Sequence, residues 1–392
     1  MPLASLTVLT TLVHVFVALR LLPALAAATP AWPLVAVLLA LSAVCMPLPF
    51  VRRRGPHRLW AVVQWAGLLA MGWFSSLFLL TLVRDAGLLL AWAGAWAAGA
   101  APDWPRWQGT SAVVAVALAT LVTLAGYVNA RRTAAVRRVR VPIEGLPSQL
   151  DGFTIAQLSD LHVGPTIRQR YLQRVVDAVN ALGADMVAIT GDLVDGTVPE
   201  LREHVAPLAR LKARHGTFVV TGNHEYYAGA PDWIDELRRL GLRVLLNEHV
   251  VLQTRSTHGA QTDEELFECA LLVAGVTDYT AGHFVPAHAS DPHRALHDAP
   301  PLVHTRVLLA HQPRSAAAAA AAGFSLQLSG HTHGGQFFPW NLFVPLQQPF
   351  TAGLHRLQAM WVYVSRGTGY WGPPKRFGAP SEIALITLTS AR

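Results

Sequence analysis

Long apolar runs separated by short polar stretches fill the first third of the chain. Four of them, at about residues 4–27, 31–51, 60–83 and 108–129, approach the roughly 20 residues that a helix needs to cross a bilayer. A shorter apolar run at residues 86–100 follows Arg84 and Asp85. Its length favours a re-entrant or interfacial segment over a fifth span. The pattern therefore predicts a transmembrane domain over residues 1–130.

From about residue 141 the pattern becomes that of a globular domain. Short apolar or β-branched runs, each ended by polar or glycine residues, predict buried strands. Helical spacing at residues 168–182, 231–242 and 314–324 predicts helices between them. We therefore expect an α/β domain over residues 145–392, after a basic linker at 131–144. The predicted strands are "FTIAQL", "DMVAIT", "TFVVT", "LLVAGV", "RVLLA", "LQLS" and "EIALITL".

Charge placement orients the predicted spans. The chain is 52% hydrophobic yet carries a formal net charge of +7, and basic clusters at 51–58 and 130–140 lie near span ends. Four spans put both clusters on one side of the membrane, whereas five would separate them. The positive-inside rule then predicts a multi-pass inner-membrane protein whose α/β domain is cytoplasmic. Because the positive charge lies beside the membrane, we expect lipid bilayer as a partner and no nucleic acid.

Polar side chains that bind metals follow five of the predicted strands. Ligands collect at the carboxyl ends of strands in layered α/β folds, so these groups are expected to converge along one sheet edge. Neighbouring glycines let the backbone turn sharply and approach the site closely. In chain order the five groups are Asp160 and His162, Asp192 and Asp195, Asn223 with His224 and Glu225, His311, and His331 with His333.

The residue types of these groups indicate the metal. Mixed Asp, His and Asn ligation suits divalent Mn, Fe or Zn. The number of ligands exceeds what one metal with an open position needs, so two metals sharing a carboxylate fit better, a pair suited to attack on phosphorus. Each motif alone is also common in a turn or a helix cap. Five in order, each after an apolar strand, favour the metal site.

The five blocks resemble the calcineurin-like metallophosphoesterases. The family signature is D-x-H, G-D-x-x-D, G-N-H-D/E, a lone His and G-H-x-H. Here it stands as "DLH" (160–162), "GDLVD" (191–195), "GNHE" (222–225), "HQP" (311–313) and "GHTH" (330–333). The "SGHTHGGQ" block and the closing residues are similar to the membrane-anchored bacterial branch. The resemblance covers about residues 145–390 and implies a four-layer αββα sandwich.

The resemblance also implies roles for single residues. His224 would donate a proton to the leaving oxygen or stabilise the transition state. Glu225 would orient His224, and Asp195 would fix a metal ligand. Relatives often have H-N-P-D where this chain has "HQPR", so Arg314 either adds positive charge near a phosphate or faces solvent. One ion would be held by Asp160, His162, Asp192 and His333, and the second by Asp192, Asn223, His311 and His331.

The expected function is a membrane-anchored phosphohydrolase that cleaves phosphodiester or pyrophosphate bonds by a metal-bound hydroxide. Four spans exceed what tethering requires, which favours a lipid-linked substrate. The alternative is a non-catalytic membrane sensor or transport protein with a metal-binding domain. Two further segments leave alternatives open. The histidine-rich segment 282–304 could be a third metal site or a surface loop covering the site, and Lys375 and Arg376 could contact substrate phosphate or face the membrane surface.

Overall fold

The computed structural model describes residues 3–51, 58–253 and 270–391, so most of the basic cluster at 51–58 lies outside the described residues. Contacts divide the chain into two compact units. One contains residues 1–129 and 372–377, and we call it the helical unit. The other contains residues 130–371 and 378–392, and we call it the catalytic unit.

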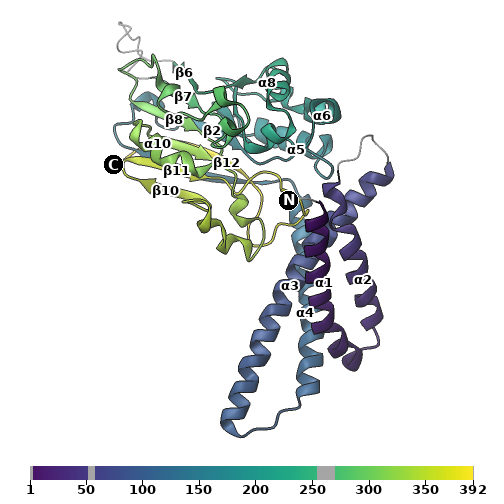
Figure 1. Ribbon diagram of the computed structural model, residues 1–392. Coiled ribbons are helices and arrows are strands. Elements are labelled where there is room, and N and C mark those ends of the chain that lie inside the picture. Colours follow the sequence, from purple (N-terminus) through teal and green to yellow (C-terminus); the bar gives the residue numbers. More distant parts are fainter. Residues whose placement is uncertain (1–2, 52–57, 254–269, 392) are drawn as a thin grey trace. The chain divides into compact units, whose positions relative to one another are not determined.

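Four helices make up most of the helical unit (Figure 1). All four, the second together with the turns that follow it as far as Phe50, are long and apolar enough to cross a membrane. They also carry a cluster of charged side chains, in which Arg20 Nε lies 2.7 Å from Asp85 Oδ2 and Arg84 Nη1 lies 2.9 Å from Asp85 Oδ1. The helices are α1 (Leu3–Ala28), α2 (Trp32–Cys45), α3 (Arg58–Ala98) and α4 (Trp104–Arg131).

The third predicted span is longer than the sequence pattern indicated. We expected it to end at residue 83 and residues 86–100 to form a separate re-entrant segment, but α3 continues without a break from Arg58 to Ala98. No proline interrupts this stretch, and leucine and alanine after Asp85 are good helix formers. The ion pairs of Asp85 offset the cost of placing charged groups inside a long apolar helix.

The segment 372–377 belongs to the helical unit, although it lies far along the chain from the helices. Lys375 is only 1% exposed. Its Nζ donates hydrogen bonds to Gly72 O at 2.8 Å and Thr123 Oγ1 at 3.2 Å. The backbone N–H of Arg376 donates to Gly126 O at 2.8 Å. These bonds correct our expectation for Lys375, which faces helix groups of α3 and α4 and neither a substrate phosphate nor the membrane surface.

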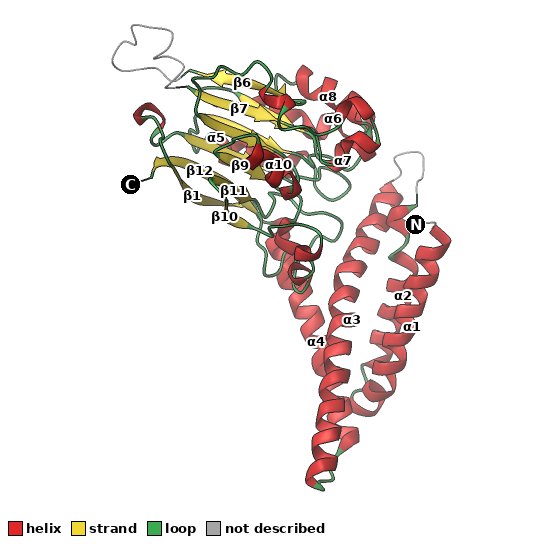
Figure 2. Ribbon diagram, turned by 60° about the vertical axis from the view of Figure 1, so that its left-hand side comes forward, coloured by secondary structure: helices red, strands yellow, loops and turns green. Residues whose placement is uncertain are grey.

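Two mixed six-stranded sheets form the catalytic unit (Figure 2). The first has the order β1 (Ala135–Ile143), β12 (Glu382–Ser390), β2 (Thr154–Leu158), β3 (Met186–Thr190), β4 (Thr217–Val220) and β5 (Arg243–Val244). The second has the order β10 (Gly353–Leu357), β11 (Met360–Val364), β9 (Leu326–Ser329), β8 (Thr305–Leu309), β7 (Leu271–Gly275) and β6 (Glu248–Leu252).

Three apolar clusters build the layers of this unit. One joins side chains of both sheets, among them Ile155 of β2 and Leu328 of β9. A second packs α5 (Gln169–Asn180), α6 (Val198–Val205) and α8 (Ala230–Arg239) on the first sheet. The third packs α10 (Ala316–Ala321) on the second sheet. The result is the expected fold: four apolar helices, then a mixed two-sheet α/β sandwich of the calcineurin-like type.

All seven runs predicted as strands contain strands, namely β2, β3, β4, β7, β8, β9 and β12. The segment 131–144, expected to be a linker, contains β1 instead. Its arginines hid the strand because β1 is an edge strand with most of its first residues exposed. β2, β3 and β4 are parallel neighbours, as are β8 and β9. Within each group the carboxyl ends therefore lie at one edge.

Candidate metal centre

The expected ligands all follow the carboxyl ends of these parallel strands. Asp160 and His162 follow β2, Asp192 follows β3, and Asn223 begins the short helix α7 (Asn223–Ala228) after β4. His311 follows β8, and His331 and His333 follow β9. Five of these residues have a positive φ, a conformation that side chains other than glycine rarely adopt. They are Asp160, His162, Asp192, His331 and His333.

Two glycines permit the close backbone approach that brings these strand ends together. A Cβ atom on Gly222 would lie 2.2 Å from Asp192 Oδ1. A Cβ atom on Gly330 would lie 1.9 Å from Ser159 Oγ and 2.2 Å from Asp160 Oδ2. Neither position has room for a side chain, so the glycines of "GNHE" and "GHTH" are required by packing.

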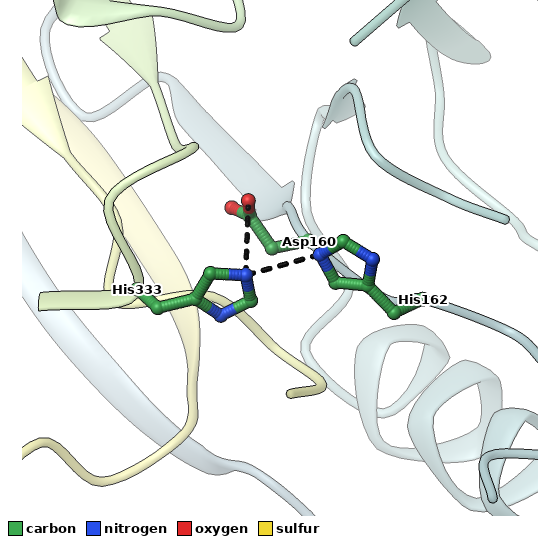
Figure 3. A group of neighbouring side chains, drawn as sticks. All are labelled: Asp160, His162 and His333. Carbon is green, nitrogen blue, oxygen red and sulfur yellow. Dashed lines mark hydrogen bonds and ion pairs between the residues drawn. The ribbon is translucent and has the colours of Figure 1, made fainter. Parts of the chain in front are cut away.

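Asp160, His162 and His333 form the first cluster (Figure 3). The Nε2 atoms of His162 and His333 lie 3.0 Å apart, and His333 Nε2 lies 3.6 Å from Asp160 Oδ1. On the other side of its ring, His162 Nδ1 lies 2.9 Å from Asp195 Oδ1. That carboxylate accepts the Nδ1 proton and leaves Nε2 as the lone-pair donor, the arrangement seen around metal-ligating histidines.

Asp192, His311 and His331 form the second cluster. His311 Nε2 lies 3.0 Å from Asp192 Oδ2 and 3.1 Å from His331 Nδ1. Its Nδ1 donates to the carbonyl oxygen of Thr190 at 2.8 Å, which again leaves Nε2 directed into the cluster. The ring of His311 is therefore oriented by the end of β3.

Asp192 joins the two clusters. Its Oδ2 lies 3.0 Å from His311 Nε2, 3.9 Å from His162 Nε2 and 4.0 Å from His224 Nε2. Its Oδ1 accepts the backbone N–H of His224 at 2.9 Å. One carboxylate thus faces imidazoles of both clusters, which is the position that a shared ligand of two cations requires.

The donor set fits divalent metal ions. Within the described part of the chain, Oδ1 of Asn223 is buried and has no hydrogen-bond donor, although a buried carbonyl oxygen of this kind normally finds a partner. Two pairs of imidazole nitrogens face each other at 3.0 Å and 3.1 Å. Carboxylate, imidazole and amide donors directed at one another in this way could hold cations between them.

Comparisons with known proteins agree with this geometry. A family model described as calcineurin-like phosphoesterase matches residues 153–335. A transmembrane protein with metallophosphoesterase domain from Bos taurus is 39% identical over 315 residues, which cover 79% of this chain and 69% of that protein. A protein of the same name from Danio rerio is 38% identical over 288 residues, which cover 71% of this chain and 63% of that protein. An uncharacterized metallophosphoesterase of Campylobacter jejuni is 35% identical over 275 residues, with 70% and 68% covered.

The chain belongs to the calcineurin-like phosphoesterases. It is a membrane protein with a metal-dependent phosphoester hydrolase domain, and its relatives include bacterial proteins. The chain spans 69% and 63% of the length of the two vertebrate relatives. Membership in the family supports an enzymatic function over the non-catalytic sensor or transport protein that the sequence left open.

Burial and neighbouring charges shift the pKa values of the expected ligands in different directions. Burial lowers the pKa of His331 to about 3, with His311 acting in the same direction, so His331 is neutral. Burial alone would raise the pKa of Asp192, but His311 opposes it and holds that pKa well below its usual range. Burial raises the pKa of Asp160. Asp192 is thus the carboxylate that stays ionised most strongly.

Asp195, and not Glu225, contacts the ring of His224. Asp195 Oδ1 lies 2.7 Å from His224 Nδ1. Burial lowers the pKa of His224, but the hydrogen bond to Asp195 and the charge of Asp192 outweigh burial and raise that pKa to about 9. This corrects our expectation for Glu225. Asp195 also lies beside His162, so one carboxylate positions two histidines.

Glu225 holds the backbone instead. Its Oε1 accepts the N–H groups of Leu193 at 2.7 Å and Val194 at 3.3 Å. Its Oε2 accepts those of Asp192 at 3.0 Å and Gly222 at 2.6 Å. The side chain of Glu225 therefore fixes the turn that carries Asp192.

A pocket of about 170 Å³ opens beside the second cluster, and its lining includes Asn223, Tyr227, Arg314 and His331. Arg314 is exposed, and its Nε donates to Gln347 O at 2.7 Å. It therefore both lines the pocket and reaches solvent. Sequence reasoning missed the aromatic residues Tyr227 and Trp371, whose ring centroids lie 5.3 Å and 5.9 Å from that of His224.

Asp278 is a third residue that the sequence reasoning missed. Its carboxylate accepts from Gln312 Nε2 at 3.0 Å and so orients the residue after His311. Asp278 follows β7 closely, so the rule that found the other strand-end groups could have found it. The histidine-rich segment 282–304 consists of short turns. No candidate metal cluster among the described residues includes a histidine from it.

Proposed function

We propose that this chain is a membrane-anchored dinuclear-metal phosphohydrolase that cleaves phosphodiester or pyrophosphate bonds of a lipid-linked substrate. The observation that carries the proposal is the position of Asp192, whose Oδ2 faces His162, His224 and His311 at 3.0–4.0 Å. A carboxylate shared between two groups of ligands is the central element of two-metal phosphoryl chemistry.

The ligand assignment follows the two clusters. Two divalent cations, Mn, Fe or Zn, would supply Lewis-acid chemistry here, by neutralising phosphate charge and lowering the pKa of water. Asn223 contributes its buried carbonyl oxygen and adds no charge. Asp160, His162, Asp192 and His333 would hold the first cation, and Asp192, Asn223, His311 and His331 the second.

His224 is the proposed proton donor to the leaving oxygen. Asp195 accepts the Nδ1 proton of His224 at 2.7 Å, so the ring orientation is fixed. The opposite nitrogen, Nε2, then points toward Asp192 Oδ2 at 4.0 Å, beside both clusters. A proton on Nε2 lies where a leaving oxygen of a bound phosphoester would develop charge, and the positive ring would stabilise that charge.

The lipid-linked substrate is supported by the helical unit. Four helices that can each cross a membrane are more than a tether requires, and they confine the site to the neighbourhood of a bilayer. The arginines at 130–140 follow the last of these helices directly. By the positive-inside rule they orient the catalytic unit toward the cytoplasm of an inner membrane.

Replacing His224 by alanine in the full-length, metal-loaded protein tests the catalytic part. We expect turnover of an aryl phosphodiester to fall by about 100- to 10,000-fold, the usual contribution of a positioned acid, with metal content unchanged. His297→Ala is the matched control, because its side chain is 79% exposed and it should keep full activity. Full activity of His224→Ala would refute the role of that residue.

A substrate panel tests the lipid-linked part. The wild-type protein would be assayed in detergent and in vesicles against lipid-linked pyrophosphates, phospholipid diesters and soluble nucleotides. We expect a higher kcat/KM for a lipid-linked phosphoester than for any nucleotide. The reverse order would contradict the lipid-linked substrate and leave the phosphohydrolase assignment intact.

A further inference from the structure

An uncharged segment follows the last metal-binding motif. Residues 334–354 contain no Asp, Glu, Lys, Arg or His. Within it, residues 338–346 include two short turns, η9 (Trp340–Leu342) and η10 (Val344–Leu346). We call residues 338–346 the apolar loop. Its exposed side chains are Phe338 at 51%, Trp340 at 48%, Leu342 at 60%, Phe343 at 52% and Leu346 at 80%.

So many large apolar side chains in nine residues are not expected on a surface that faces only water. Single exposed apolar residues are normal, but a contiguous patch marks an interaction surface. The rings of Trp340 and Phe343 lie 5.8 Å apart, so these side chains form a group. The absence of charged residues in this part of the sequence means that burial of the loop would desolvate no ionised group.

The residues just before the apolar loop bond to the two residues that flank the segment 372–377. Gln336 Nε2 donates to Trp371 O at 2.8 Å, and Trp371 N–H donates to Gln336 Oε1 at 2.9 Å. Phe337 forms a β-bridge with Gly378. Residues 371 and 378 flank the segment 372–377, which packs among helices that can cross a membrane. Gln336 and Phe337 are therefore bonded to residues that are joined by peptide bonds to a segment of the helical unit.

We infer that the apolar loop is a lipid-binding element that inserts into the bilayer interface. Trp, Phe and Leu are the residues that partition there, with the indole ring at the headgroup level. A second copy of the chain could also cover an apolar patch. Lipid is favoured because Gln336 and Phe337, just before the loop, bond to residues 371 and 378, which are joined directly to a segment that packs among apolar helices.

The position of the apolar loop links lipid contact to the candidate site. The metal-binding residues His331 and His333 lie just before it, and Gln347 and Gln348, just after it, line the pocket beside Asn223. Insertion of the loop would place that pocket at the membrane interface. This consequence deepens the proposed function and rests on it, whereas the lipid contact itself does not.

Label quenching in the full chain tests the contact. The two cysteines, Cys45 and Cys269, would be replaced by alanine. Leu342→Cys and Leu346→Cys would then carry an environment-sensitive fluorophore in nanodiscs of phosphatidylcholine and phosphatidylglycerol. Glu203→Cys, at an exposed position of α6, is the control. We expect lipids with a nitroxide on the acyl chain to quench both loop labels several-fold more than the control label.

Two results would overturn the inference. Loop labels that are quenched no more than the Glu203→Cys label would show that the loop does not enter lipid. Efficient disulfide formation between copies through Leu346→Cys, without quenching, would assign the patch to a second copy. Thermal unfolding of both labelled variants checks their fold. Quenching needs no turnover, so a wild-type protein that hydrolyses no phosphoester would remove the proposed function without changing this result.

Discussion

Replacing Glu225 by glutamine should weaken the turn that carries Asp192, the proposed shared ligand. The two oxygens of Glu225 accept four backbone N–H groups, from Asp192, Leu193, Val194 and Gly222. A glutamine has the same shape but only one acceptor oxygen. Whichever way its amide is turned, the NH2 group faces two N–H donors and leaves both without an acceptor.

The magnitude follows from burial. Glu225 is 2% exposed and the residues it binds are also buried. A buried N–H without an acceptor costs about 1–3 kcal/mol, so two of them cost about 2–6 kcal/mol. Burial raises the pKa of Glu225, and Asp192 adds to the effect, so removing the charge of Glu225 recovers part of the lost stability. We expect a net loss of about 2–4 kcal/mol.

Thermal unfolding of the metal-free, full-length protein in detergent measures the effect. For a domain of this size the loss corresponds to a fall in Tm of about 5–15 °C. Metal content after reloading, measured by mass spectrometry, should fall as well because Asp192 is displaced. Glu203→Gln is the matched control: it removes an exposed carboxylate of α6 and should leave both values unchanged.

One outcome would refute this reasoning. If Glu225→Gln kept the wild-type Tm and metal content but lost activity, the residue would act on His224 and not on the backbone. A loss of Tm and metal content together supports the backbone role.

Two further changes probe packing and charge in the catalytic unit. Gly330→Ala forces a methyl group to within 2.2 Å of Asp160 Oδ2, so it should lower stability by about 1–3 kcal/mol and remove most of the bound metal. The control is Gly87→Ala, whose Cβ would meet nothing within 4 Å and which should leave metal content unchanged. Wild-type metal content in Gly330→Ala would contradict the packing argument. The hydrogen bond from Arg239 lowers the pKa of Glu236 to about 2, against burial. A carboxyl group whose pKa is lowered in the folded state stabilises the fold at pH values above its unfolded-state pKa of about 4.5. This stabilisation is lost as the pH falls toward 2. Glu236→Gln should therefore lower Tm by a few degrees at pH 7, with the difference narrowing below pH 4.5; a constant difference would exclude the ion pair as its cause.

Sequence reasoning identified the buried strands and the groups at their ends. "DMVAIT" and "LQLS" are apolar because β3 and β9 are covered on both faces, and such runs are readable without any knowledge of pairing. The carboxyl-end rule then brought together side chains that are 171 residues apart, as in His162 and His333. The family signature added the pairing of these groups into two clusters.

Features that depend on tertiary contacts could not be predicted from the sequence. β1 lies at a sheet edge and exposes its arginines, so its pattern is that of a linker. Residues 372–377 join the helical unit through Lys375, and nothing in local sequence indicates which distant helix a segment meets. The resemblance implied that Glu225 orients His224, but the two residues are neighbours in α7, and neighbouring helix positions do not face each other.

Backbone strain and unsatisfied polar atoms are concentrated at the residues of the five sequence motifs. Asp160, His162, Asp192, His331 and His333 all have positive φ, a strain of about 1 kcal/mol or more each. The Oδ1 of Asn223 is buried without a donor among the described residues, and imidazole nitrogens face each other at 3.0–3.1 Å. Apolar packing explains none of these features, whereas cations placed among these donors would offset all of them. The inference from strain to function therefore points to the same place as the inference from sequence, although the two use independent observations.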